Sequence, residues 1–293
     1  MATQRTLGVI GGSGLYGLDG LEQVEHVRLD TPFGAPSDDY LVGTLGDARL
    51  VFLPRHGRGH RLLPGEVNSR ANIHGMKQLG VEWIVSVSAV GSMREDVRPG
   101  DLVIVDQFID RTRQRPSSFF GDGAVGHIAF ADPVCPLLHD WLVTAARGAA
   151  EAADAGARIH ERGTYVVIEG PQFSTRAESL LYRSWGVDVI GMTALPEAKL
   201  AREAEICYAT VALATDYDCW HHAEEAVTVE AVLAVLRRNV ATARDVVRRA
   251  VDLARHPRSC PCPEAARGAL MTDLGHLTPE ARRRLDRIVG KYL

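Results

Sequence analysis

The sequence predicts a single α/β domain in which helices flank a mixed central β-sheet. Short runs rich in β-branched residues, bounded by Gly or Pro, recur along the chain with amphipathic segments between them. Several of these runs are apolar nearly throughout, as expected of strands that are covered on both faces. The chain has 293 residues, of which 46% are hydrophobic, so it holds enough apolar material for one large core.

The pattern places each element in turn. Strands are expected at residues 7–10, 49–53, 83–90, 102–108, 164–168, 187–192 and 206–214, and helices at 67–78, 136–153, 175–185 and 196–205. A regular apolar stripe predicts a long helix after Thr228. From about residue 255 a Pro-rich loop leads to a last helix that begins at Thr278, with Pro279 in its first turn. We expect this C-terminal part to act as a lid or a subunit contact within one domain, 1–293.

Composition narrows the range of partners. The net charge is −4 and the pI is about 6.3, so no global positive field attracts nucleic acid or an anionic membrane, and a small-molecule ligand fits better. The N-terminal residues lack the pattern of a signal peptide and no run reaches transmembrane length, which favours a cytoplasmic protein.

The five cysteines are an odd set without C-x-x-C spacing. This spacing predicts no metal site and no disulfide framework, and reduced thiols are expected. Cys260 and Cys262, which flank Pro261, are the alternative: they could oxidise to a strained and reducible bond.

A glycine-rich loop, Gly12-Ser13-Gly14-Leu15-Tyr16-Gly17, follows the first strand and matches the G-x-G-x-x-G string of dinucleotide sites. No regular helix is expected to start in this loop, so NAD is discounted. Two interpretations stay open. The turn can cradle a single phosphate with its backbone N–H groups beside the Ser13 hydroxyl, or it can be a ligand-free exit from the strand.

A second loop, Arg55-His56-Gly57-Arg58-Gly59-His60, follows an apolar strand. An Arg fork suits two phosphate oxygens, and His can donate or shuttle a proton. The same four basic side chains could equally form a solvated turn. The residue chemistry alone does not decide between a phosphate site and such a turn.

Further loops end other predicted strands, where open α/β sheets place their ligands. Ser88 and Ala89 lie in a stretch of small residues, Phe173 could stack on a planar base, and Met192 and Thr193 follow another strand. Asp216 and Asp218 end an apolar strand and suit a purine edge: one carboxylate accepts from an amine while a protonated one donates to a ring nitrogen. The alternatives are ordinary strand ends, a core Phe and a solvated acidic loop.

Taken in order, these segments resemble the trimeric purine nucleoside phosphorylase family, and in particular its members that cleave 5′-modified adenosines. The resemblance spans nearly the whole chain. It rests on Gly11-Gly12-Ser13-Gly14-Leu15, Thr31-Pro32-Phe33-Gly34, Arg55-His56-Gly57-Arg58, Pro99-Gly100-Asp101, Asp106-Gln107-Phe108-Ile109-Asp110-Arg111-Thr112, Ile168-Glu169-Gly170-Pro171, Arg176-Ala177-Glu178-Ser179 and Ala214-Thr215-Asp216-Tyr217-Asp218-Cys219-Trp220.

The resemblance implies an activity and roles for individual residues. The implied reaction is phosphorolysis of 5′-methylthioadenosine to adenine and 5-methylthioribose 1-phosphate, with 5′-deoxyadenosine, 5′-halogenated adenosines or methylthioinosine as alternative substrates. Asp216 and His56 are implied as catalytic. The implied phosphate ligands are Ser13, Arg55, His56, Ser88, Ala89 and Thr193; the nucleoside contacts are Phe173, Met192, Asp216, Tyr217, Asp218, Val232 and Leu233, with His127 from a neighbouring subunit; and Ser174 and Val229 are tied to substrate choice.

The sequence departs from the family pattern at Gly191, where the better-known residue is Asn, and at Ser13 and Ser88, where it is Thr. The resemblance further implies no metal and no cofactor, inorganic phosphate as co-substrate, and a homotrimer or a hexamer made of two trimers. It also places Cys135 and Cys207 near cysteines that are bridged in some thermophilic members. The competing functions are a nucleosidase that uses water, a dinucleotide-dependent oxidoreductase and a noncatalytic nucleoside-binding module.

Overall fold

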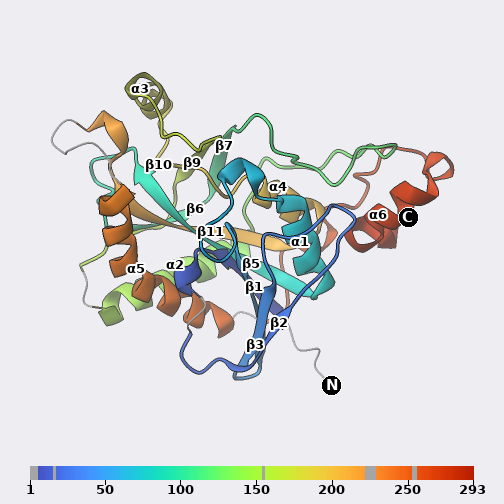
Figure 1. The fold of residues 1–293 in the computed structure, drawn as a ribbon, viewed down its shortest axis with the longest axis horizontal. Helices are drawn as coiled ribbons and strands as arrows, with labels where there is room; N and C mark the ends of the chain where they lie inside the picture. The colour runs from blue at the N-terminus through green and yellow to red at the C-terminus, as the bar shows by residue number, and fades with distance from the viewer. Residues whose placement is uncertain (1–5, 16–17, 154–155, 222–228, 253–255) are drawn as a thin grey trace.

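A mixed β-sheet forms the centre of the protein (Figure 1). The structure, a computed structural model, describes residues 6–15, 18–153, 156–221, 229–252 and 256–293. The strands of the described part are β1 Thr6–Gly11, β2 Glu22–Val27, β3 Tyr40–Leu45, β4 Ala48–Pro54, β5 Val81–Ser92, β6 Leu102–Val105, β7 Gln107–Arg111, β8 Ile159–His160, β9 Thr164–Ile168, β10 Val189–Gly191 and β11 Cys207–Asp216.

Strand β5 lies at the centre of the sheet and pairs with β1, β10 and β11. It pairs in parallel with β1 on one side and with β11 on the other, and its last residues, Gly91 and Ser92, pair antiparallel with β10. The order β2-β3-β4-β1-β5-β10-β9-β7 continues the sheet, while β6 joins through β11 and β8 through β6. The parallel strands β1, β4, β5 and β11 therefore send their carboxyl ends toward the same edge, where α/β sheets form ligand crevices.

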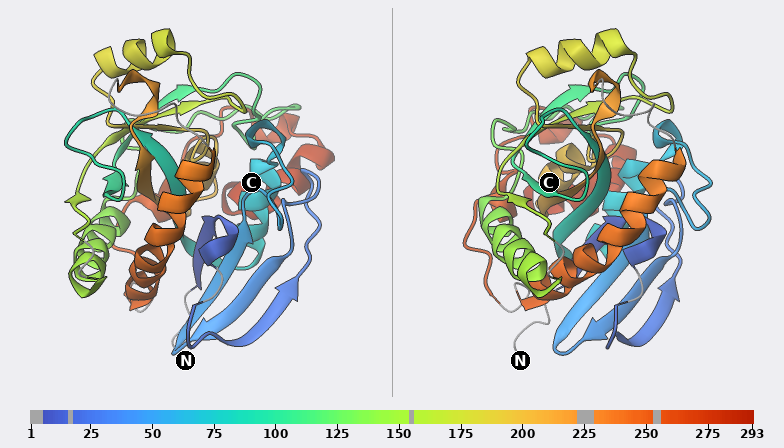
Figure 2. Two further views of the ribbon diagram at one scale, coloured as in Figure 1. Left: turned by 60° about the vertical axis from the view of Figure 1, so that its left-hand side comes forward. Right: turned by 90° about the vertical axis from the view of Figure 1, so that its left-hand side faces the viewer.

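Helices cover both faces of the sheet (Figures 1 and 2). One face packs against α2 Pro136–Ala153 and α5 Val229–Ala250, and the other against α1 Ser69–Gln78, α4 Glu197–Glu203 and α6 Pro279–Val289. Each face has its own apolar core, because the strand residues alternate between the two sides. Helix α3, Arg176–Ser184, stands apart from these layers at the top of both views in Figure 2.

The structure confirms the predicted α/β class with its mixed sheet, and it differs from the prediction in detail. The single strand expected at 102–108 is two strands, β6 and β7, which pair with different partners, β11 and β9. Strands β2, β3 and β8 were not predicted. Every residue of β2 is exposed or half-exposed, and β8 has only two residues, so neither carries an apolar signal.

The C-terminal segment crosses from one face of the sheet to the other. It leaves α5, passes Cys260 and Cys262, and ends in α6, which lies beside α1. Thr278 caps α6 by accepting from the backbone N–H of Ala281 at 3.1 Å. The role of this segment as a lid or subunit contact stays a prediction. In the described part of the chain, no helix is long and apolar enough to cross a membrane.

Candidate active site

A cavity of about 200 Å³ opens at the carboxyl ends of the central strands. Loops after β4, β9, β10 and β11 and the last residues of β5 converge there, although they are far apart in the sequence. The structure therefore brings together most of the predicted site. The predicted residues that line the cavity are His56, Ala89, Phe173, Ser174, Met192, Thr193, Asp216 and Asp218.

Two carboxylates form one end of the cavity. Oδ1 of Asp216 accepts the backbone N–H of Asp218 at 2.8 Å, and its Oδ2 accepts the hydroxyl of Thr215 at 2.8 Å. Gly91 of β5 lies against this pair: a Cβ at that position would lie 2.9 Å from Oδ1 of Asp216. The absence of a side chain at Gly91 thus leaves room for both the acidic loop and a ligand.

The carboxyl group of Asp218 has a shifted pKa. Burial raises the pKa of its carboxyl group above the ordinary value, against an opposing hydrogen bond from the Ser179 hydroxyl to Oδ2 at 2.5 Å. Its backbone is also held at φ +52°, in the left-handed region. Burial therefore makes this carboxyl a better proton carrier near neutral pH than an ordinary aspartate.

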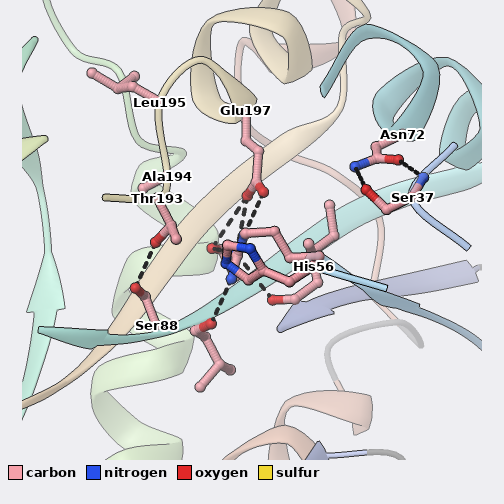
Figure 3. A network of polar contacts seen from close by, with 12 residues as sticks. Ser37, His56, Asn72, Ser88, Thr193, Ala194, Leu195 and Glu197 are labelled. Atoms are coloured by element: carbon pink, nitrogen blue, oxygen red, sulfur yellow. Dashed lines mark hydrogen bonds and ion pairs between the residues drawn. The ribbon is translucent and has the colours of Figure 1, made fainter. Parts of the chain in front are cut away.

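Hydroxyl groups form the other end. The Oγ of Ser88 and the Oγ1 of Thr193 lie 2.5 Å apart, facing each other across the ends of β5 and β10 (Figure 3). The hydroxyl of Tyr165, which is buried, lies 3.3 Å from Thr193 Oγ1 and accepts the backbone N–H of Thr193 at 3.3 Å. These donors are neutral and are fixed by the strands, so they suit an anion.

His56 stands beside these hydroxyls. Its Nδ1 lies 2.9 Å from the carbonyl oxygen of Leu62, which can only accept, so Nδ1 carries the proton and Nε2 is the acceptor in the neutral ring. Burial, followed by the charge of Arg55, lowers the pKa of His56 to about 4. His56 is therefore neutral at pH 7, and its ring stacks on His60 with centroids 4.4 Å apart.

The Arg55 side chain is held by a buried ion pair. Its guanidinium is buried and does not line the cavity, because Nε and Nη2 bind the Glu197 carboxylate at 2.6 and 3.1 Å. Further donors reach Ser86 Oγ and the carbonyl of Val87, at 2.8 and 3.1 Å. Glu197, at the start of α4, points into this network in Figure 3. Direct phosphate binding by Arg55 stays a prediction, and the carboxylate that holds its guanidinium belongs to no sequence motif.

Tyr165 explains the departure from the family pattern at Gly191. A Cβ on Gly191 would clash with the hydroxyl of Tyr165, so an Asn side chain does not fit at this position in the present packing. The tyrosine hydroxyl instead reaches Thr193, two residues further along the chain. Sequence reasoning missed Tyr165 and Glu197. Tyr165 is the polar side chain in an otherwise apolar strand, and Glu197 is a single acidic residue after an apolar run. Neither pattern is specific to a ligand site.

The other residues predicted to contact the nucleoside fall into two groups. Phe173, with 55% of its surface exposed, and Ser174, whose Oγ is buried without a hydrogen-bond partner among the described residues, line the cavity as predicted. Tyr217 does not: its ring stacks on His221 at 4.6 Å, and its hydroxyl donates to the carbonyl of Glu95. The left-handed turn at Asp218 follows Tyr217 directly, and the ring packs outside the cavity.

Several predicted residues cannot be placed or lie elsewhere. Ser13 begins a short 3₁₀ turn, Ser13–Leu15, and its side chain lies outside the described ones. The side chains of Val229, Val232 and Leu233 also lie outside them. His127 lies on an exposed segment between β7 and α2, and it does not line this chain's cavity.

The cysteines form a cluster that their spacing in the sequence did not predict. All five are free thiols, but Cys135, Cys207, Cys260 and Cys262 gather with every sulfur within 4.8 Å of the others. The spacing rule predicted no metal-type cluster because it looks for pairs within one segment, whereas these cysteines come from three parts of the chain.

The chain belongs to the phosphorylase superfamily, whose sequence profile matches residues 6–252. It is similar to S-methyl-5′-thioadenosine phosphorylase of Geobacter sulfurreducens, with 58% identity over 99% of this chain and 100% of that protein. The enzyme of the same name from Koribacter versatilis is 56% identical, over 99% of this chain and 97% of the other.

Solved structures have the same fold. A methylthioadenosine phosphorylase from an antarctic soil metagenomic library is 49% identical and superimposes with a TM-score of 0.91, covering 98% of this chain and 99% of the other. Methylthioadenosine phosphorylase of Schistosoma mansoni in complex with adenine is 38% identical, with a TM-score of 0.84 and coverage of 92% and 98%.

Proposed function

We propose that this protein catalyses phosphorolysis of S-methyl-5′-thioadenosine, giving adenine and 5-methylthioribose 1-phosphate. The relatives with this activity in their names are up to 58% identical over the full chain, and the superfamily assignment covers most of it. The observation that carries the proposal is the polarity of the cavity: carboxylates at one end and hydroxyls with a neutral imidazole at the other.

This polarity sets the orientation of the two substrates. Two carboxylates repel a phosphate anion and attract the N6 amine of adenine, so the base belongs beside Asp216 and Asp218. Phosphate then belongs beside Ser88, Thr193 and the backbone of Ala89. Met192 lines the cavity and is assigned to the ribose, and Phe173 flanks the base. In this orientation phosphate lies on the side of the sugar away from the leaving purine, as in-line displacement requires.

Each end has a task in the reaction. As the glycosidic bond lengthens, positive charge develops on the sugar, and a bound phosphate stabilises that charge and attacks C1′. The purine leaves with negative charge at N7, which a proton from the carboxylate pair neutralises. The raised pKa of Asp218 favours holding that proton in the pair, so we assign the acid role to Asp216 and Asp218 together. Neutral His56 accepts a hydrogen bond from a protonated phosphate oxygen through Nε2. No organic cofactor or metal takes part in these steps.

Adenine preference rests on the same carboxylates. An amide in place of Asp216 would both donate to and accept from a 6-oxopurine, whereas a carboxylate suits an amine. Ser174, with an Oγ that lacks a partner in the described part of the chain, can contribute a further contact to the base. The proposal predicts strong preference for methylthioadenosine over inosine and methylthioinosine. Equal turnover of the 6-oxopurines would refute the adenine assignment.

We also propose a homotrimer, with a hexamer of two trimers as the alternative, in the cytoplasm. Large apolar side chains remain exposed beside the cavity mouth: Phe173, together with Leu180 and Leu181 of α3, which are 48% and 50% exposed. Such a patch favours a subunit contact there, and it is consistent with His127 reaching a neighbour's site. Light scattering of the purified protein measures the number of chains directly.

A further inference from the structure

Four cysteines meet at the end of β11 opposite the active site. Cys207 begins β11, and Asp216 ends it nine residues later, so the two sites are about 30 Å apart along the strand. Cys135 immediately precedes α2, and Cys260 and Cys262 belong to the C-terminal segment. Cys207, Cys135 and Cys262 are buried, with 0%, 1% and 2% exposure, and Cys260 is half-buried.

The spacing of the sulfur atoms fits one metal ion. All four Sγ atoms lie within 4.8 Å of one another, and those of Cys207 and Cys260 are 3.4 Å apart. Four thiolates at the zinc–sulfur distance of about 2.3 Å form a tetrahedron with edges of about 3.8 Å. The cluster therefore needs only small side-chain adjustments to accept such an ion. Iron–sulfur clusters need more widely separated ligands, since inorganic sulfide and several irons lie between them.

The surroundings already hold the cluster together. The backbone N–H of Leu138, in the first turn of α2, points to Cys135 Sγ at 3.5 Å, and donors of this kind stabilise metal-bound thiolates. Arg258, two residues before Cys260, donates to the carbonyl of Glu205, two residues before Cys207, at 3.0 Å. Apolar residues from α2, α5 and the sheet pack around the cysteines and exclude water.

We propose that Cys135, Cys207, Cys260 and Cys262 bind a structural zinc ion. Soft thiolates select zinc over magnesium and calcium, and four protein ligands leave no open position for catalysis. Binding replaces one proton on each thiol with a zinc–sulfur bond, so no oxidant is consumed. The ion joins the start of α2, the start of β11 and the C-terminal segment, and it holds that segment where it crosses to the face covered by α6.

The test is metal analysis of the full-length protein purified under reducing conditions without chelator. We expect about one zinc per chain, with no loss of mass from disulfide formation and with zinc released stoichiometrically by a mercurial. Cys260→Ser and Cys262→Ser should each lose zinc. Cys219→Ser is the matched control, because Cys219 is outside the cluster and should leave the zinc content unchanged.

A second measurement uses the wild-type protein, so it does not depend on the Ser variants being folded. Wild-type protein stripped of metal should bind Co²⁺ and develop the intense visible bands of a tetrahedral tetrathiolate site, which one equivalent of Zn²⁺ removes. Three outcomes would overturn the proposal: five free thiols without metal, disulfides within the cluster, or zinc retained by both Ser variants. A coloured protein containing iron instead would replace zinc as the occupant and overturn the zinc assignment.

Discussion

Two layers of the active site differ in burial. The floor is the buried ion pair of Arg55 and Glu197 with Tyr208, whose hydroxyl donates to Glu197 at 3.0 Å. The wall consists of His56, Thr193 and the acidic loop, which are half-exposed and line the cavity. The difference indicates that adjacent residues, such as Arg55 and His56, serve different ends: the floor stabilises the fold and shapes the cavity, and the wall is the layer that a ligand in the cavity can reach.

The largest effect of a substitution is expected on the free energy of unfolding, at the ion pair of the floor. Glu197→Ala leaves the Arg55 guanidinium buried without its carboxylate, so the free energy of unfolding should fall by about 3–5 kcal/mol. Urea unfolding measures this change. Glu280→Ala is the control, because its pair with Arg283 is about 70% exposed and screened by solvent, so the unfolding curve should be nearly unchanged. A Glu197→Ala protein as stable as wild type would erase the distinction between floor and wall.

The next effect is expected at the acidic end of the wall. Asp216→Asn and Asp218→Asn should each lower kcat/KM for methylthioadenosine by about 10²-fold, the scale of one acid–base group, and leave stability nearly unchanged. Because burial raises the pKa of Asp218, wild-type activity that depends on the protonated pair should fall as pH rises through that pKa. Steady-state kinetics across pH gives both results. Unchanged kinetics in both variants would remove the carboxylates from the chemistry.

Removing the hydroxyl of either of two buried tyrosines should have a smaller effect, which differs between phosphate binding and stability. Tyr165→Phe removes the hydroxyl that positions Thr193, so the KM for phosphate should rise by about 2–10-fold with little change in stability. Tyr208→Phe removes a hydrogen bond in the floor and should lower stability by about 0.5–1.5 kcal/mol. Measuring the phosphate KM and the unfolding free energy of both variants tests the contrast. The reverse pattern would contradict it.

The smallest effect is a pH dependence at His56. The folded pKa of about 4 lies below the ordinary value of 6.5, so between these values the unfolded chain binds a proton that the folded chain refuses. Folding stability should therefore fall as pH drops from 6.5 toward 4. His56→Asn should lack this contribution, and the difference between the two unfolding curves isolates it from other groups. Parallel curves would show that His56 titrates normally.

The sequence predicts the wall much better than the floor. Wall residues follow strand ends in short motifs, so their convergence follows from parallel topology, as at His56 and Asp216. The ion pair of Arg55 could not be predicted, because its partner, Glu197, is 142 residues away and belongs to no motif. The same reason hid the cysteine cluster, in which only Cys260 and Cys262 are close in sequence. Strand positions followed from apolar runs, whereas the exposed β2 left no such trace.

Oxygen-labelled phosphate tests the central claim most directly. The claim is that phosphate bound at the hydroxyl end of the cavity attacks C1′ of methylthioadenosine. With phosphate carrying ¹⁸O at every position, the enzyme should form adenine and a methylthioribose phosphate that retains every labelled oxygen, including the one bonded to C1′. Adenine release that continues without phosphate, giving unlabelled free methylthioribose, would contradict the account and identify a hydrolase.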